Sequence, residues 1–248
     1  PVLFPLVGKV WDGTYRMDGA EFHLGQHGFA RNCEFTEIPV EAEDEAWYAL
    51  ESSDETLKLY PRRFRLEIGY RLQEARLTVM WRVTNTDSRT LHFHIGAHPA
   101  FNYPDFDPAD ALHGYLAFDH PSPKSELLDN LGYIVDGHET LGLDEEGMLP
   151  ITAATFERLK TIILADRQIR RVSMLDSRRR PYVTVLFDAP VVGLWSPSPD
   201  APFVCIEPWW GTPDREGYTA DFADRPYTNT IAPGRTFEAT YTIIFDNL

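Results

Sequence analysis

A glutamate near the C-terminal end of the chain has the surroundings of a catalytic carboxylate. Glu207 lies in the apolar run Phe203–Gly211, where the alternation of a strand puts it on the same face as Phe203 and Cys205. Burial among apolar side chains raises the pKa of a carboxyl group and makes it a usable general base near neutral pH. Glu207 is therefore a candidate general base, and a structural ion pair with an arginine is the alternative explanation.

A histidine-rich segment earlier in the chain begins as a strand and then breaks. If it stays extended, His92, His94 and His98 share one face. Histidines spaced by two on a strand can bind one metal ion, as in a cupin-like barrel, although hydrogen-bonded imidazoles are also common on sheet faces. Gly96 and Pro99 break the strand and place His98 at the rim of the sheet, where a side chain can contact a substrate.

A third segment offers hydrogen-bond donors on a loop. His27 and Arg31 belong to the sequence Gln26-His27-Gly28-Phe29-Ala30-Arg31, which directly follows a predicted hairpin. Such side chains can bind the hydroxyl groups of a small molecule. A surface histidine and an arginine in a salt bridge are the alternative. The sequence contains no glycine-rich phosphate loop, nucleophile elbow or cysteine pair with zinc spacing.

The elements that must position these residues are mostly strands. Apolar and polar residues alternate with period two over residues 64–72, 77–83 and 237–245, which indicates half-buried strands. Asp18-Gly19 is a two-residue hairpin signal, because both turn positions tolerate a positive φ. Helices are predicted only as a turn or two within residues 41–50 and in a stretch after Pro108.

The whole chain is predicted to form one all-β domain over residues 1–248. This length suits a single core, and many short strands separated by 19 prolines and 16 glycines favour an antiparallel β-sandwich or barrel.

The charge balance restricts the partners. A formal net charge of −15 opposes binding to nucleic acids and to anionic membranes, so a small molecule is the expected ligand. No apolar run approaches the ~18 residues of a membrane span, and the first residues lack the basic region of a signal peptide. The two cysteines, Cys33 and Cys205, have neither a metal-ligand spacing nor the numbers of a disulfide framework. A soluble, cytoplasmic protein is expected.

Four motifs in order resemble the aldose 1-epimerase (galactose mutarotase) family, and most of all its LacX-like branch. They are Leu3-Phe4-Pro5-Leu6-Val7-Gly8-Lys9, His27-Gly28-Phe29-Ala30-Arg31, Gly96-Ala97-His98-Pro99-Ala100-Phe101-Asn102 and Cys205-Ile206-Glu207-Pro208-Trp209. The resemblance implies a large antiparallel β-sandwich, the galactose mutarotase-like supersandwich, with the sugar on its concave face. Family members begin with additional strands before the first motif, so the resemblance also implies that some N-terminal strands are lacking.

The resemblance further implies a role for each motif. His98 matches the family's general acid, Glu207 its general base and His27 a substrate-binding histidine. Lys9 stands where many members have a substrate-binding arginine, and Arg31 matches a basic residue of the branch. The implied activity is interconversion of α and β anomers by opening and reclosing a cyclic hemiacetal. Two proton transfers suffice, without metal or redox cofactor.

Departures from the family pattern leave the sugar open. Lys160 stands where galactose-specific members have a carboxylate, and Asp166 is nearby but out of register. A hexose-6-phosphate 1-epimerase is the nearest alternative and requires Lys9, Arg31 and Lys160 to converge on a phosphate. A carbohydrate-binding module without catalysis is the other. A small sugar is the expected partner, and the protein is expected to be a monomer or a homodimer.

Overall fold

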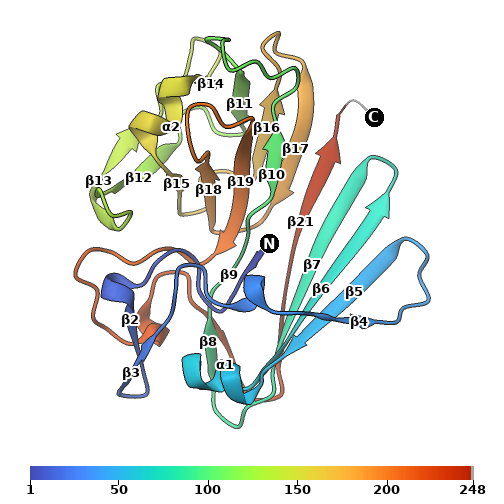
Figure 1. The fold of residues 1–248 in the computed structure, drawn as a ribbon, viewed down its shortest axis with the longest axis vertical. Coiled ribbons are helices and arrows are strands. Elements are labelled where there is room, and N and C mark those ends of the chain that lie inside the picture. The colour runs from blue at the N-terminus through green and yellow to red at the C-terminus, as the bar shows by residue number, and fades with distance from the viewer. Residues whose placement is uncertain (247–248) are drawn as a thin grey trace.

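Two large antiparallel sheets dominate the computed structural model, which describes residues 1–246 (Figure 1). The larger sheet contains, in spatial order, β14 (Met148–Ile151), β11 (Gly114–Phe118), β16 (Arg171–Leu175), β17 (Pro181–Phe187), β21 (Thr236–Phe245), β7 (Arg76–Asn85), β6 (Phe64–Gln73), β5 (Glu45–Glu51) and β4 (Thr36–Ile38). The smaller sheet contains β1 (Val2–Leu3), β9 (Ile95–Ala97), β19 (Phe203–Trp210), β18 (Val191–Trp195) and β15 (Ile162–Leu164), and β10 (Ala100–Asn102) also pairs with β19. Three further pairs join β2 (Thr14–Met17) to β3 (Ala20–His23), β8 (Leu91–Phe93) to β20 (Asn229–Ile231) and β12 (Lys124–Leu128) to β13 (Ile134–Thr140).

The two sheets pack against each other through a shared apolar core. Trp81 of β7 meets Trp210 of β19 edge to face, with ring centroids 5.6 Å apart. Tyr241 of β21 packs on Trp81 from within the larger sheet at 5.5 Å. Aromatic pairs in this arrangement bury large apolar areas and add favourable ring contacts. The prediction of an all-β, antiparallel sandwich is therefore confirmed.

The three strands predicted from alternation are present as β6, β7 and β21. Side chains of β6 alternate between buried and partly buried from Phe64 to Ile68, as expected for a half-buried strand. Toward the β6–β7 turn, Tyr70 and Leu72 are 39% and 58% exposed. The core therefore covers only the first half of this strand.

The helix predictions are wrong. Residues 45–51 form β5, which pairs with β4 on one side and β6 on the other, so sheet pairing decides the conformation of this segment. The stretch after Pro108 consists of turns and bends. The helices are instead α1 (Asp54–Leu59), α2 (Ala153–Leu159) and the 3₁₀ turns η1 (Trp11–Gly13), η2 (Ala30–Asn32) and η3 (Phe222–Asp224). None of these helices of residues 1–246 is long and apolar enough to cross a membrane.

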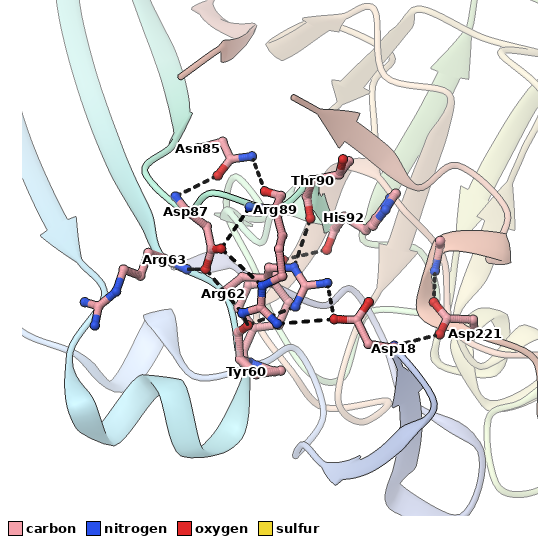
Figure 2. Close-up of polar contacts among 12 residues, drawn as sticks. Asp18, Tyr60, Arg62, Arg63, Asn85, Asp87, Arg89, Thr90, His92 and Asp221 are labelled. Carbon is pink, nitrogen blue, oxygen red and sulfur yellow. Dashed lines mark hydrogen bonds and ion pairs between the residues drawn. The ribbon is translucent and has the colours of Figure 1, made fainter. Parts of the chain in front are cut away.

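The predicted hairpin at Asp18-Gly19 is confirmed and is anchored by a buried arginine. Its two turn residues have φ values of 53° and 78°. The Asp18 carboxylate accepts hydrogen bonds from Arg62 at 2.7 Å and from Arg89 at 3.3 Å, and the Asp18 backbone N–H donates to the Asp221 side chain at 3.1 Å (Figure 2). Arg62 is buried, so this ion pair is shielded from solvent on one side. The network fixes the hairpin and thereby the start of the segment that carries His27.

Candidate active site

His98 and Glu207 are brought together by the register of the smaller sheet. On β19, Trp209 lies opposite Gly96 of β9 and Cys205 lies opposite Ala100 of β10. The same register holds on both sides of the break between β9 and β10, and it puts His98 opposite Glu207. The His98 Nδ1 atom lies 3.4 Å from Glu207 Oε1. Two residues 109 positions apart in sequence thus become direct neighbours.

The three histidines expected to share a strand face do not do so. The strand is interrupted at His94, because β8 ends at residue 93 and β9 begins at residue 95. His92 hydrogen-bonds Thr230 at 3.0 Å, and His94 hydrogen-bonds the Thr228 hydroxyl at 3.2 Å. Alternation therefore cannot be extended from His92 to His98, and the cupin-like arrangement of His92, His94 and His98 is absent from residues 1–246.

All five residues expected at the site line one cavity of about 430 Å³. Its lining residues are Gly8, Lys9, Gln26, His27, Arg31, His98, Leu128, Gly132, Thr161, Ile163, Trp195, Glu207, Trp209 and Pro213. This volume lies within the range of small-molecule sites. Glu207 supplies the single carboxylate in that lining.

The carboxyl group of Glu207 is buried without a cationic partner from arginine or lysine. Its side chain is 2% exposed, and Oε2 has no hydrogen-bond partner within residues 1–246. Burial raises the pKa of Glu207 well above its ordinary value, and the neighbouring Trp209 indole opposes this only in part. The alternative of a structural ion pair with an arginine is therefore wrong for the described residues.

Burial acts on His98 in the opposite direction. It lowers the pKa of the imidazole because the charged form loses hydration, and the charge of Arg31 lowers it further. The ring is enclosed edge to face by two others, His27 and Trp195, each with its centroid 5.7 Å away. Low dielectric surroundings on both groups favour a His98–Glu207 pair that holds one proton between them.

His27 is held in one tautomer by the backbone of the first motif. Its Nδ1 accepts a hydrogen bond from the Gly8 N–H at 3.1 Å, and its own backbone N–H donates to the Gly8 carbonyl at 2.8 Å. Burial, with the charges of His98, Arg31 and Lys9, lowers the pKa of His27 to about 3. The ring is therefore neutral near pH 7 with its proton on Nε2, which lies at the cavity 3.1 Å from the side-chain amide of Gln26.

The loop after His27 requires the glycine that the sequence supplies. Gly28 has a φ of 69°, and a Cβ atom at this position lies only 2.3 Å from the Phe4 carbonyl oxygen. That oxygen accepts hydrogen bonds from the backbone N–H groups of Phe29 at 3.1 Å and Ala30 at 3.2 Å. Close backbone contact thus joins the first motif to the second on one side of the cavity.

The fold places two of the three expected cationic residues at the cavity and the third outside it. Lys9 lines the cavity and donates from Nζ to the Leu131 carbonyl at 2.8 Å. Arg31 also lines it and has no carboxylate partner among the described residues. Lys160 lies outside this lining and donates to the Asn130 side chain at 3.0 Å. Two of the three cations proposed for a phosphate site therefore lie at the cavity, and the third does not.

Two tryptophans line the cavity, and the sequence identified only one of them. Trp209 faces the cavity, whereas its neighbour Trp210 packs on Trp81 in the core. Trp195 at the end of β18 also lines the cavity, and sequence reasoning missed it. It pairs in register with Cys205, so knowledge of the β18–β19 pairing is the signal that identifies it. Both indoles at the cavity are suited to the apolar faces of a sugar ring.

A buried ion pair that the sequence did not reveal supports the Lys9 segment. Asp214 pairs with Arg225, and the two side chains are 3% and 1% exposed. The same carboxylate accepts the Trp11 backbone N–H at 2.7 Å, and the Asp214 N–H donates to the Lys9 carbonyl at 2.9 Å. Burial raises the pKa of Asp214, with the Arg225 charge opposing it. Asp214, paired with Arg225, therefore fixes the backbone at Lys9 and at Trp11.

Replacing Asp214 by asparagine is expected to lower the free energy of unfolding by about 3–5 kcal/mol, because it leaves the buried Arg225 charge uncompensated. Urea unfolding of the two proteins measures the difference. Glu21→Gln is the matched control: it removes a partner of Arg16 in a pair with side chains 36% and 60% exposed and costs at most about 1 kcal/mol. Equal losses in both variants contradict the expectation.

Comparisons with known proteins show which sequences and which folds this chain is similar to. The family model described as aldose 1-epimerase matches residues 1–123, a stretch that contains Lys9, His27 and His98. The chain is 30% identical over 267 residues to the chromosomal protein LacX of Lactococcus lactis subsp. lactis, covering 100% of this chain and 85% of that protein. A galactose mutarotase related enzyme from Lactobacillus acidophilus superimposes with a TM-score of 0.87 at 28% identity, over 99% of this chain and 82% of that one. A galactose mutarotase-like protein from Lactobacillus casei ATCC 334 gives 0.88 at 27% identity, over 98% and 84%.

Proposed function

The chain belongs to the aldose 1-epimerase family, in its LacX-like branch, and we propose that it interconverts the α and β anomers of a small sugar. The observation that carries the proposal is the His98–Glu207 pair. These residues are neighbours in the register of the smaller sheet, with His98 Nδ1 3.4 Å from Glu207 Oε1, and both line the cavity of about 430 Å³. A half-buried acid and a buried base at the same cavity are what the opening and closing of a hemiacetal require.

The reaction consists of two proton transfers and a rotation. With the single proton of the pair on His98, Glu207 accepts the proton of the C1 hydroxyl while His98 donates its proton to the ring oxygen, so that the C1–O5 bond breaks and a carbonyl forms at C1. Rotation about the C1–C2 bond exposes the other carbonyl face. The roles then reverse: the ring hydroxyl adds to C1, its proton returns to His98, and Glu207 returns a proton to the C1 oxygen. The pair ends with the same single proton.

The remaining cavity residues bind and orient the sugar. His27, neutral with a proton on Nε2, donates a hydrogen bond to a sugar oxygen, and Lys9 stabilises negative charge that develops on it. Trp195 and Trp209 provide apolar surface for the ring faces. The proposed enzyme is an isomerase that needs no cofactor, and the free thiols Cys33 and Cys205 are consistent with a cytoplasmic setting.

The proposal is tested by polarimetry on freshly dissolved α-anomers of glucose, galactose and other aldoses. The approach to the anomeric equilibrium is expected to accelerate in proportion to protein concentration for at least one sugar. If the protein binds a sugar but leaves every mutarotation rate at the uncatalysed value, it is a carbohydrate-binding module instead. If the protein neither binds nor accelerates the mutarotation of any sugar or sugar phosphate, both the enzyme and the carbohydrate-binding module are contradicted.

A sugar phosphate is the second candidate substrate, and the cations at the cavity favour it. Lys9 and Arg31 line the cavity of a chain whose net charge is −15, and Arg31 has no carboxylate partner in the described part of the chain. Charge-assisted contacts of this type are typical of phosphate recognition. Comparison of kcat/KM for hexoses and their 6-phosphates decides between the two. A phosphate substrate predicts that Arg31→Gln lowers kcat/KM for the phosphate far more than for the free sugar.

The rate of mutarotation is expected to show a plateau near neutral pH with a fall on each side. Adding a second proton to the pair removes the base, and this step lies below the ordinary histidine value of about 6.5, because burial lowers the pKa of His98. Losing the single proton removes the acid, and this step is displaced toward alkaline pH because burial raises the pKa of Glu207. Initial rates across pH, corrected for the buffer-catalysed reaction, measure the profile. A rate that falls only on the acid side, at the pH where an ordinary carboxyl group titrates, contradicts this expected profile.

A further inference from the structure

Three side chains with metal-binding atoms meet at the His98–Glu207 pair. The ligand atoms of His98, Cys205 and Glu207 all lie within 4.8 Å of one another. Cys205 and Glu207 are two residues apart on the same face of β19, and His98 faces them from the break between β9 and β10. An imidazole, a thiol and a carboxylate together are a donor set suited to Zn²⁺, which takes nitrogen, sulfur and oxygen ligands.

The separation of His98 and Glu207 fits one ion. A tetrahedral ion with bonds of roughly 2.1 Å to a nitrogen and an oxygen holds these two atoms roughly 3.4 Å apart. His98 Nδ1 and Glu207 Oε1 are 3.4 Å apart, a separation longer than that of a charge-assisted hydrogen bond. Glu207 Oε2 is buried and has no hydrogen-bond partner within residues 1–246. A buried oxygen of this kind gains from a cation.

We propose that His98, Cys205 and Glu207 form an inhibitory site for a thiophilic divalent cation of the Zn²⁺ class, whose fourth position faces the cavity. When the ion binds, the Cys205 thiol and the His98–Glu207 pair each release one proton to solvent as the metal–ligand bonds form, and the metal stays in its divalent state. The ion occupies the lone pairs that His98 and Glu207 need for proton transfer. Binding is independent of the proposed function, whereas the inhibitory effect rests on it.

The decisive variant removes the sulfur donor. Cys205→Ser and Cys205→Ala both eliminate the thiolate; the alanine variant also keeps the apolar environment if a buried hydroxyl disturbs folding. Cys33→Ser is the matched control, because Cys33 lies at the end of the Ala30–Asn32 turn and outside the cluster. Two readouts are used: the near-ultraviolet thiolate-to-metal band on titration with Co²⁺, and the Zn²⁺ concentration that halves the mutarotation rate.

The wild-type protein and Cys33→Ser are expected to bind one Co²⁺ with the thiolate band, and both Cys205 variants to lack the band. The half-inhibiting Zn²⁺ concentration is expected to rise at least about tenfold in the Cys205 variants. Their metal-free rates stay close to wild type, and EDTA restores the rate of the zinc-treated wild type. Absence of the band in the wild type, or equal zinc inhibition of the wild type and both Cys205 variants, overturns the site. If no sugar is turned over, the Co²⁺ titration still decides metal binding, so the two proposals fail separately.

Discussion

Replacing Glu207 by glutamine is expected to lower the rate constant of mutarotation by about 10² to 10⁴. Glutamine keeps the size of the side chain but cannot accept the C1 hydroxyl proton. The carboxyl group has no arginine or lysine partner within residues 1–246, so its neutralisation leaves no unpaired cation behind. The substitution therefore removes chemistry while the fold and the cavity are retained. Polarimetry gives the rate, and circular dichroism with urea unfolding checks the fold.

The matched control for this variant is Glu43→Gln. Glu43 is exposed and has no hydrogen bond or ion pair among the described residues, so its loss of charge leaves the mutarotation rate unchanged. A wild-type rate in Glu207→Gln removes Glu207 from the mechanism. A low rate accompanied by loss of the folded spectrum shows a structural role instead.

Replacing His98 by asparagine is expected to have an effect of the same order, about 10² to 10⁴ in kcat, with a smaller effect on KM. Asparagine can still form hydrogen bonds at this position but cannot carry the transferred proton. Because His98 and Glu207 share one proton, the double variant is expected to be little slower than either single one. His138→Asn provides the control, since His138 lies exposed on β13. Effects that multiply in the double variant contradict a shared proton.

The alternation of residues was sufficient to predict three long strands and one half of the site. Period two located β6, β7 and β21, and it placed Glu207 on an apolar face of β19, where the structure has it buried. Turn chemistry located the hairpin at Asp18-Gly19. These features depend on interactions close in sequence, which a single chain displays directly.

Features that depend on partner strands could not be obtained in this way. The prediction that His92 and His98 share a strand face is wrong, because the strand is interrupted at His94 and its two parts belong to different sheets. Residues 45–51 look compatible with a helix until their pairing with β4 and β6 is known. Trp195 owes its place at the cavity to the register of β18 with β19. Each of these depends on contacts between distant segments, which override local preference.

The Asp214–Arg225 pair belongs to the same category. Neither residue stands in a motif, and their contact joins segments that local reasoning treats as loops. Their burial is visible only once the backbone around Lys9 and Trp11 is placed.

The break between β9 and β10 also limits how this site can change its length. Both short strands are locked to the same edge of β19, one at Gly96 and the other at Ala100. Inserting or deleting one residue between them forces one ladder to slip, and a slip by one residue turns every side chain of that strand to the opposite face. Selection for new sugars can therefore exchange side chains around the cavity, but it must leave the chain length between Gly96 and Ala100 unaltered.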